Sequence, residues 1–139
     1  MPDPIPPRNS AMAVAASALQ AQQSRMRIIA ENIANAQSTA PVAGGQPYRR
    51  QIPVFQAREI NGSTGVALAE VRVDQGDFKS EYDPSHPAAN AEGYVLRPNV
   101  DTLVEAMDMR EAQRAYEANL NSIETARSMD SRTLDILKK

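Results

Sequence analysis

The chain of 139 residues contains no cysteine, no tryptophan and only two phenylalanines. The lack of cysteine excludes disulfides and thiolate metal sites, and it fits either a reducing compartment or an exported protein that avoids thiol chemistry. Because large aromatic residues are scarce and the apolar content leans on alanine, one copy can build only a thin core for this length. We therefore expect a chain that is a poor candidate for a self-sufficient globule.

The sequence also lacks a block of one charge and a long apolar run. The net charge is -2, and no basic face of the kind used to bind nucleic acid is visible. No stretch approaches the roughly eighteen apolar residues of a membrane span. The run from Ala11 to Leu19 could belong to a secretory signal, but Asp3 and four prolines precede it and the helical pattern continues past it. These absences predict no nucleic-acid partner, no membrane span and no cleaved signal peptide.

Glycine and proline, the strongest helix breakers, are missing from both ends of the chain. All six glycines lie between Gly44 and Gly93, and neither residue type occurs in 8–40 or 99–139. This partition predicts long helices over 9–39 and 99–139, which together form one discontinuous helical rod domain. A central loop and β-hairpin segment at 40–98 separates them, and the proline-rich residues 1–8 form a disordered leader.

The first predicted helix carries a narrow apolar stripe with heptad spacing. Two series, each repeating every seven residues and offset by three, make up this a/d seam: Met12, Leu19, Met26 and Ile33, then Ala15, Gln22, Ile29 and Ala36. Such a seam predicts that this helix pairs with another helix.

The second predicted helix has an apolar face and a marked start. Asn99 follows Pro98 and is the expected N-cap, so we expect the helix to begin at Val100, with Asp101 adding a negative charge to the first turn. One face carries Met109, Ala112, Tyr116, Leu120, Ile123, Leu134 and Leu137. The expected fold class is mainly α with a small β insert, in which the terminal helices pair as a coiled-coil-like bundle.

The middle of the chain has β character. The segments 48–57 and 66–73 predict two strands joined by a turn at 61–65, and 94–96 can add a short third strand. The segments 38–46 and 83–87 are predicted loops. An isolated hairpin is marginal in water, so we expect it to lie on a helix or on a neighbouring subunit.

The apolar stripes allow two interpretations of the helices. Each buried alanine contributes far less than the roughly 1.5–3 kcal/mol of a buried leucine or isoleucine. The helices could form an intramolecular coiled coil in an ordinary small protein. Alternatively, the chain could be a subunit whose helices become ordered when many copies pack together.

The residues that could carry chemistry are few. His86 is the only histidine and stands in a proline-rich turn, where we expect a surface residue and no catalysis. We expect no cofactor or metal, and we interpret Met107, Met109 and Met129 as core residues. The basic pair after Tyr48 could form a small anion site, although an exposed basic strand start is the simpler interpretation.

Several short motifs resemble the bacterial flagellar rod and hook proteins. The sequence AENIANA at 30–36, Thr39, the glycine pair at 44–45 and PYRR at 47–50 resemble the N-terminal signature of that family, and the long spacer before Pro47 resembles its proximal-rod members. The match continues through YDPSHP at 82–87, GYV at 93–95, PNVD at 98–101, MDM at 107–109 and RAYEAN at 114–119. It covers about residues 10–137.

Two departures from the family pattern concern the middle of the chain. Many relatives carry Thr-Pro-Gly-Tyr, whereas a loop separates Thr39 from Tyr48 in this sequence. The segment 74–77 also differs from the Ser-Pro that relatives carry at that site. The geometry of these turns is therefore not transferred from the family.

The resemblance implies a non-enzymatic structural subunit of the proximal rod in the flagellar basal body. It implies export through the flagellar type III apparatus without a cleaved signal peptide, followed by helical assembly with copies of itself and with other rod proteins into the drive shaft that crosses the periplasm. A helical binding module, such as an adaptor or a type III export chaperone, is the alternative from a different class.

The resemblance and the helix pattern together nominate a set of assembly residues. An asparagine near a helix end can bond backbone groups at the turn, and the motif around Tyr116 is expected to make contacts between helices or subunits. The set comprises Asn32, Ile33, Ala34, Asn35, Thr39, Tyr48, Arg49, Arg50, Tyr82, Pro84, Pro87, Asn99, Met107, Met109, Arg114, Tyr116, Glu117, Asn119, Leu120 and Ile123.

Overall fold

The computed structural model describes residues 8–138, and it contains two long helices and four strands. In chain order these are α1 (Arg8–Ala34), β1 (Gln51–Ile60), β2 (Ser63–Val73), β3 (Lys79–Tyr82), β4 (Tyr94–Arg97) and α2 (Thr102–Leu137). The predicted fold class, mainly α with a small β insert, is confirmed. Of the predicted leader, 1–7 lie outside the described residues, and Arg8 belongs to α1.

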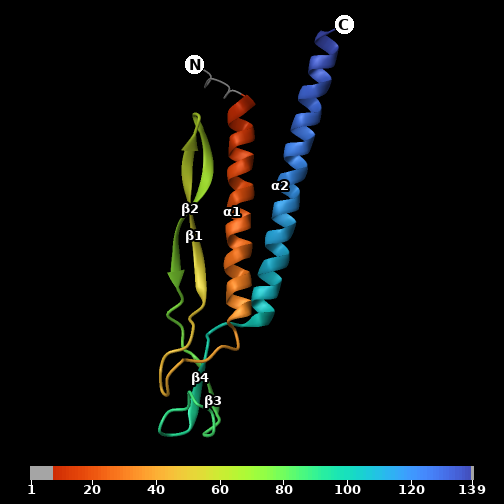
Figure 1. The fold of residues 1–139 in the computed structure, drawn as a ribbon. Helices are drawn as coiled ribbons and strands as arrows, with labels where there is room; N and C mark the ends of the chain where they lie inside the picture. Colours follow the sequence, from red (N-terminus) through yellow and green to blue (C-terminus); the bar gives the residue numbers. More distant parts are fainter. Residues whose placement is uncertain (1–7, 139) are drawn as a thin grey trace.

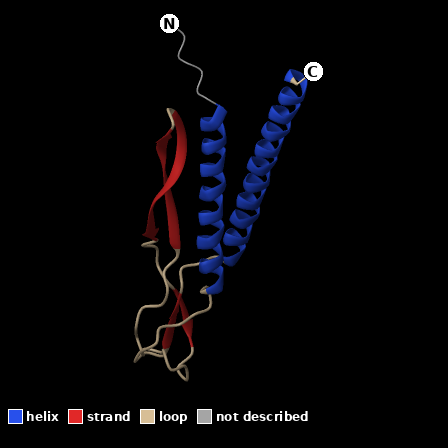
Figure 2. Cartoon of the chain, turned by 45° about the horizontal axis from the view of Figure 1, so that its top comes forward, coloured by secondary structure: helices blue, strands red, loops and turns tan. Residues whose placement is uncertain are grey.

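The molecule is long and narrow, with α1 as its middle layer (Figure 1). The β1–β2 hairpin packs along one side of α1, and α2 runs antiparallel to α1 along the other. The β3–β4 hairpin lies at the far end from both termini. The two helices approach each other where α1 ends and α2 begins, and they diverge toward the termini (Figure 2).

Helix α1 ends earlier than predicted, at Ala34 rather than near residue 39. Asn35 donates its side-chain amide to the Glu31 carbonyl at 2.8 Å, and the Ser38 hydroxyl donates to the Asn35 carbonyl at 2.8 Å. These side chains bond carbonyl groups at and just after the helix end and offer the backbone an alternative to another helical turn. The predicted C-terminal boundary is therefore wrong by about one turn.

The heptad seam describes only part of the buried surface of α1. Ile29 and Ala36 of the seam are buried, but Ile33 is exposed and Met26 is half-buried, while Ile28, which lies off the seam, is among the most buried side chains. The cause is the middle position of α1: a heptad stripe serves one partner, whereas α1 packs against both α2 and the hairpin.

Helix α2 begins at Thr102, capped by Asp101 rather than by the predicted Asn99. The backbone amides of Leu103 and Val104 donate to the Asp101 carboxylate, which is the geometry of an N-cap. The helix has 36 residues against 27 in α1. At about 1.5 Å per residue, α2 is therefore roughly 13 Å longer than α1.

The predicted hairpin is present, and its turn is tighter than expected. β1 pairs with β2 in antiparallel register from Ile60 opposite Ser63 to Gln51 opposite Val73. Only Asn61 and Gly62 connect the strands, with φ of 50° and 80°. Two successive residues at positive φ are the requirement of the hairpin turn that matches the twist of paired strands.

The segment expected to add a third strand does not join this hairpin. β4 pairs instead with β3, which the sequence analysis did not predict, in a separate two-stranded sheet. The rings of Tyr82 and Tyr94 pack edge to face across it, with centroids 5.3 Å apart. Neither helix of the described chain has an apolar stretch long enough to cross a membrane.

Candidate assembly surfaces

The most buried polar side chain of the nominated set is Asn32, near the end of α1. It is 1% exposed. Its amide nitrogen donates to the Gln51 carbonyl at 2.9 Å, and its oxygen accepts from the Gln51 backbone amide at 2.9 Å and from the Tyr48 hydroxyl at 2.7 Å. Asn32 thus satisfies both backbone groups of Gln51 as a neighbouring strand would, and it ties the start of β1 to α1.

The second polar contact is centred on Arg50, whose guanidinium faces three carboxylates. It donates to Glu105, and it lies 3.6 Å from Asp74 and 3.9 Å from Asp108. Glu105 is 1% exposed. Burial acts against the charge of Arg50, but its hydrogen bond to Glu105 and the charges of the carboxylates outweigh burial and raise its pKa. This cluster joins the start of β1, the end of β2 and the first turns of α2.

Asn99 and Arg49 belong to the same group of polar contacts. Asn99 accepts from the Arg50 backbone amide at 2.8 Å and donates to the carbonyls of Asp74 and Gly76 at 3.1 and 3.2 Å. Arg49 donates to the same two carbonyls, and its guanidinium lies 4.1 Å from the centroid of the Phe78 ring. Both earlier interpretations of Arg49 and Arg50, an anion site and an exposed strand start, are wrong, because both guanidinium groups bind groups of the chain itself.

Tyr48 shares this environment. Burial, together with the nearby charges of Glu31 and Glu105, raises the pKa of its hydroxyl above the ordinary value. The hydroxyl is held as a neutral donor to Asn32. We define the polar junction as Asn32, Tyr48, Arg49, Arg50, Gln51, Asp74, Asn99, Glu105 and Asp108.

The structure divides the nominated residues among separate places. Asn35 makes a local helix-end contact, and Tyr82, Pro84 and Pro87 are exposed around the β3–β4 hairpin. On α2, Met107, Arg114, Glu117 and Leu120 are exposed, whereas Met109, Tyr116, Asn119 and Ile123 are half-buried. Ile33 and Ala34 are exposed and Thr39 is half-buried. Only Asn32, Tyr48, Arg49, Arg50 and Asn99 meet at the polar junction.

Sequence reasoning missed the acidic half of the junction. Glu105 is an acidic residue in the first turn of α2, where the helix dipole alone accounts for it. Asp74 stood out only as part of a departure from the family pattern. Because Glu105 is 55 residues from Arg50 in the chain, no local signal pairs them.

A different surface is formed by apolar side chains of α2 that are exposed in the described part of the chain. Leu103, Val104 and Met107 are exposed near its start, and Met129, Leu134, Ile136 and Leu137 near its end. Leu134 and Leu137 continue the predicted apolar face, yet Leu137 is 76% exposed. Within residues 8–138 these two side chains are exposed because α2 extends past the beginning of α1 (Figure 1).

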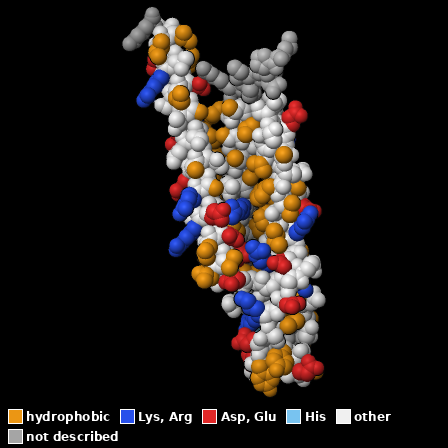
Figure 3. Space-filling view, turned by 180° about the vertical axis from the view of Figure 1, so that it is seen from behind, with side chains coloured by type: hydrophobic (Ala, Val, Ile, Leu, Met, Phe, Trp, Pro, Cys, Tyr) orange, Lys and Arg blue, Asp and Glu red, His pale blue; other side chains and the backbone are white. Residues whose placement is uncertain are grey.

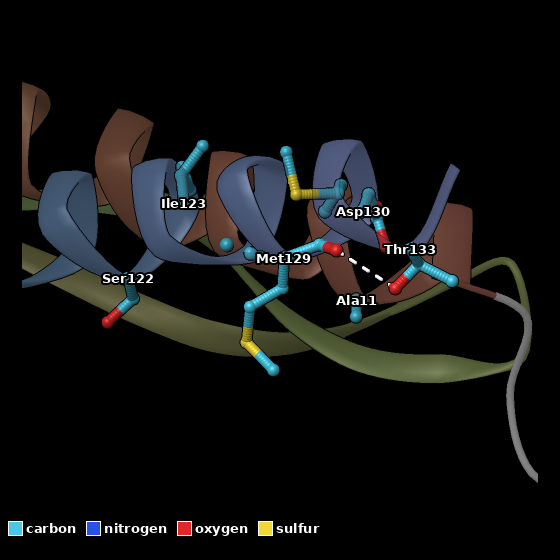
Figure 4. Close-up of a pocket in the computed structure, with 9 residues that line it drawn as sticks. Ala11, Ser122, Ile123, Met129, Asp130 and Thr133 are labelled. Atoms are coloured by element: carbon cyan, nitrogen blue, oxygen red, sulfur yellow. Dashed lines mark hydrogen bonds between the residues drawn. The ribbon is translucent and has the colours of Figure 1, made fainter. Parts of the chain in front are cut away.

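An apolar groove lies between the helices where they diverge. Ala11, Met12 and Ala15 of α1 line it, together with Ser122, Ile123, Ala126, Met129, Asp130 and Thr133 of α2. Its volume is about 430 Å³. Figure 4 shows the α2 residues of this lining alongside the turn of α1 that carries Ala11. Figure 3 shows apolar side chains gathered along the line where α2 meets the rest of the molecule.

Groups that could support catalysis are sparse in the described residues. Within 8–138, no cluster of histidine and carboxylate side chains is placed to hold a metal ion. His86 accepts a hydrogen bond from the Ala88 backbone amide at 3.0 Å, which stabilises its own turn. The distinctive features of the chain are its buried polar junction and its exposed apolar surfaces, both of which suit assembly.

Comparison with known proteins gives consistent matches at both ends and along most of the chain. Residues 12–40 match the family model described as flagella basal body rod protein, and 91–136 match that of the flagellar basal body rod FlgEFG protein C-terminal region. A protein of Agrobacterium fabrum is 45% identical over 95% of this chain and 96% of its own. Proteins of Bacillus subtilis, 38% identical over 90% and 95%, and Escherichia coli, 42% identical over 88% and 92%, are also similar. All three are named flagellar basal-body rod protein FlgC.

Proposed function

The chain belongs to the FlgC family of flagellar basal-body rod proteins and is a structural rod subunit, and we propose how it works there. It assembles helically, with copies of itself and with other rod proteins, into the proximal part of the shaft that crosses the periplasm. It performs no catalysis, and its role in motility is mechanical. The nominated motif residues either shape the subunit or lie at contacts between subunits.

The observation that carries this proposal is the exposed apolar end of α2. A soluble monomer rarely leaves a contiguous apolar surface open, and larger exposed patches commonly mark interaction sites. Here the apolar face of α2 continues past the beginning of α1, and Leu134 and Leu137 have no cover within the described chain. Neighbouring subunits supply the missing cover in the assembled rod.

The polar junction supports the same function in a different way. A shaft transmits torque only if its subunits keep their shape. Asn32 and Arg50 tie α1, the hairpin and α2 together near the closed end of the helix pair. Residues of the N-terminal motif therefore act inside the subunit, where they fix the angle between its helical and β parts.

Export forms the second part of the proposal. The subunit reaches the rod through the flagellar type III apparatus without a cleaved signal peptide. The apolar run from Ala11 to Leu19, which could suggest a cleaved signal, is an integral part of α1, and Ser17 within it accepts from the Val66 amide at 3.2 Å. The adaptor or export-chaperone alternative has no support in the names of the relatives.

The test combines a deletion strain with complementation. Cells lacking the chain should be non-motile and should lack rods, and the intact gene should restore both. Tagged protein should co-purify with isolated basal bodies. The His86→Ala variant serves as a matched control, which we expect to restore motility fully. Recovery of the chain only from the cytosol, with rods formed in its absence, would contradict the proposal.

A further inference from the structure

The end of β2 carries backbone groups that point away from β1. Both backbone groups of Gln51 bind the side chain of Asn32, so they face away from β2. In an antiparallel ladder, two opposite residues either exchange both bonds or turn their backbone groups outward together. Gln51 stands opposite Val73. Two residues back along β2, Val71 stands opposite Pro53, whose missing N–H fits the same arrangement. The backbone groups of both valines therefore face the outer edge of β2.

Elsewhere along this edge, side chains of the same chain occupy the outward groups. Toward the hairpin turn, the Ser17 hydroxyl accepts from the Val66 amide at 3.2 Å. Just past the strand, two side chains donate to the Asp74 carbonyl at 3.1 Å. Between these points, the contact within residues 8–138 is an exposed bond of 3.4 Å from the Gln75 side chain to the Val73 carbonyl. Figure 1 shows the last part of β2 on the far side of β1 from α1.

We define the open edge as residues 69–73, all of which have exposed side chains. Val71 and Val73 are 41% and 46% exposed, and because they are two residues apart they lie on one face of the strand. Glu70 and Arg72 form an ion pair with each other, so the open edge carries balanced charge. Proteins commonly protect an exposed edge with proline or lysine, and β2 contains neither. The open edge is therefore both accessible and unprotected.

We propose that the open edge receives an extended strand from a different protein of the rod, which pairs with β2 as a further strand of the hairpin sheet. This inference rests on the proposed rod function. Backbone donors and acceptors that face outward at every second residue are satisfied by an extended chain, whereas a helix bonds its backbone groups internally. The incoming strand carries apolar side chains at alternate positions, where they pack against Val71 and Val73.

A second copy of this chain fits the open edge less well. Pairing of the open edge with the same edge of another copy is isologous and closes a dimer, whereas a shaft needs contacts that repeat along its axis. The outer edge of β1 offers no continuous alternative, because Asn32 already occupies the groups of Gln51 and Pro53 has no donor. These features favour a strand supplied by a different rod protein.

Amide hydrogen exchange measures this backbone pairing directly. It is followed by mass spectrometry on isolated basal bodies and on the purified soluble chain. We expect the peptide that covers 69–73 to exchange at least about tenfold more slowly in basal bodies. Ala57 on β1 is the internal control. It stands opposite Val66, whose amide points outward to Ser17, so the Ala57 amide also faces outward. Its exchange should differ little between the two samples.

A matched pair of proline variants tests the contact in cells. Val71→Pro removes an outward amide from the open edge and leaves the bonds between β1 and β2 in place. Ala57→Pro removes an outward amide from the other strand of the same hairpin. We expect both purified variants to keep the circular dichroism of the wild type, and only Val71→Pro to abolish motility. Val71→Thr keeps the amide and should remain motile. The exchange experiment uses the wild-type chain, so it stands even if a proline variant fails to fold.

Three results overturn the inference. Unchanged exchange of 69–73 in basal bodies that contain the chain would show that no strand is added. Equal motility of Val71→Pro and Ala57→Pro would show that the open edge is not used. Protection of 69–73 in a purified dimer of the soluble chain would place a second copy there. In all three cases the rod function stands, whereas absence of the wild-type chain from basal bodies would overturn the rod function itself.

Discussion

Replacement of Asn32 by alanine should destabilise the folded chain far more than replacement of an exposed residue beside it. The side chain is buried and makes three hydrogen bonds, two to Gln51 and one to the Tyr48 hydroxyl. Alanine removes all three and leaves both backbone groups of Gln51 and the Tyr48 hydroxyl without these partners. The connection between α1 and β1 is lost at the same time.

The magnitude follows from the surroundings of these partners. An ordinary hydrogen bond contributes about 1 kcal/mol net, and a buried group left without a partner costs about 1–3 kcal/mol. Gln51 and Tyr48 are half-buried, so water can replace part of what is lost. We therefore expect a loss of about 2–4 kcal/mol, a large fraction of the roughly 5–15 kcal/mol that stabilises a typical domain.

Urea unfolding followed by far-ultraviolet circular dichroism measures this loss. With a urea dependence of about 1–3 kcal/mol per M, the midpoint should fall by about 1–2 M. Asn35→Ala is the matched control, because Asn35 makes a single local bond at the helix end, and we expect it to cost less than about 1 kcal/mol. If Asn32→Ala unfolds within about 0.5 kcal/mol of the wild type, the junction does not hold the subunit together.

Three further predictions concern the junction and the helix pair. Glu105→Ala leaves Arg50, which is only 25% exposed, without its nearest carboxylate and should cost about 2–3 kcal/mol in urea unfolding. Asp108 lies 3.9 Å from Arg50 and is more exposed than Glu105, so Asp108→Ala should cost less than about 1 kcal/mol. Equal costs for the two variants would contradict this. Ile29→Asp should unfold the monomer because Ile29 is buried. Leu120 is 37% exposed, so Leu120→Asp should leave circular dichroism unchanged and abolish motility. Normal rods in the Leu120 variant would show that this side chain is not packed against a neighbouring subunit. Because the fold raises the pKa of Tyr48 above its usual 10.0, its contribution to stability is fully present below pH 10 and is lost as the pH rises through the folded-state pKa; Tyr48→Phe should reduce this alkaline loss, and an unchanged slope would refute the assignment.

Local patterns in the sequence predicted the main elements of the fold. The ranges free of glycine and proline correspond to both helices, and Asn61-Gly62 marks the hairpin turn. These features act over a few residues, so a single sequence reveals them. The end of α1 and the cap of α2 were wrong because several polar residues compete at each boundary, and tertiary contacts decide among them. Asn99, for example, bonds Arg50 rather than its own helix.

The candidate surfaces were less predictable, because they depend on which residues, distant in the chain, lie against each side chain in the fold. The motif around Asn32 was identified, but its partner Gln51 is 19 residues away. Helical periodicity placed Leu134 and Leu137 on the apolar face, yet it cannot tell that α1 stops short of them. Exposure of these residues follows from the relative lengths of two helices, which only their packing reveals.

In the proposed rod, α1 and α2 form part of the wall, and neighbouring subunits cover the apolar surfaces left open in one copy. The most direct measurement is an image reconstruction of isolated basal bodies at a resolution that traces helices. We expect antiparallel α1–α2 pairs in the rod wall, with the end of α2 from Met129 to Leu137 enclosed by other subunits. A rod that lacks this chain, or one in which the end of α2 projects into solvent, would contradict it.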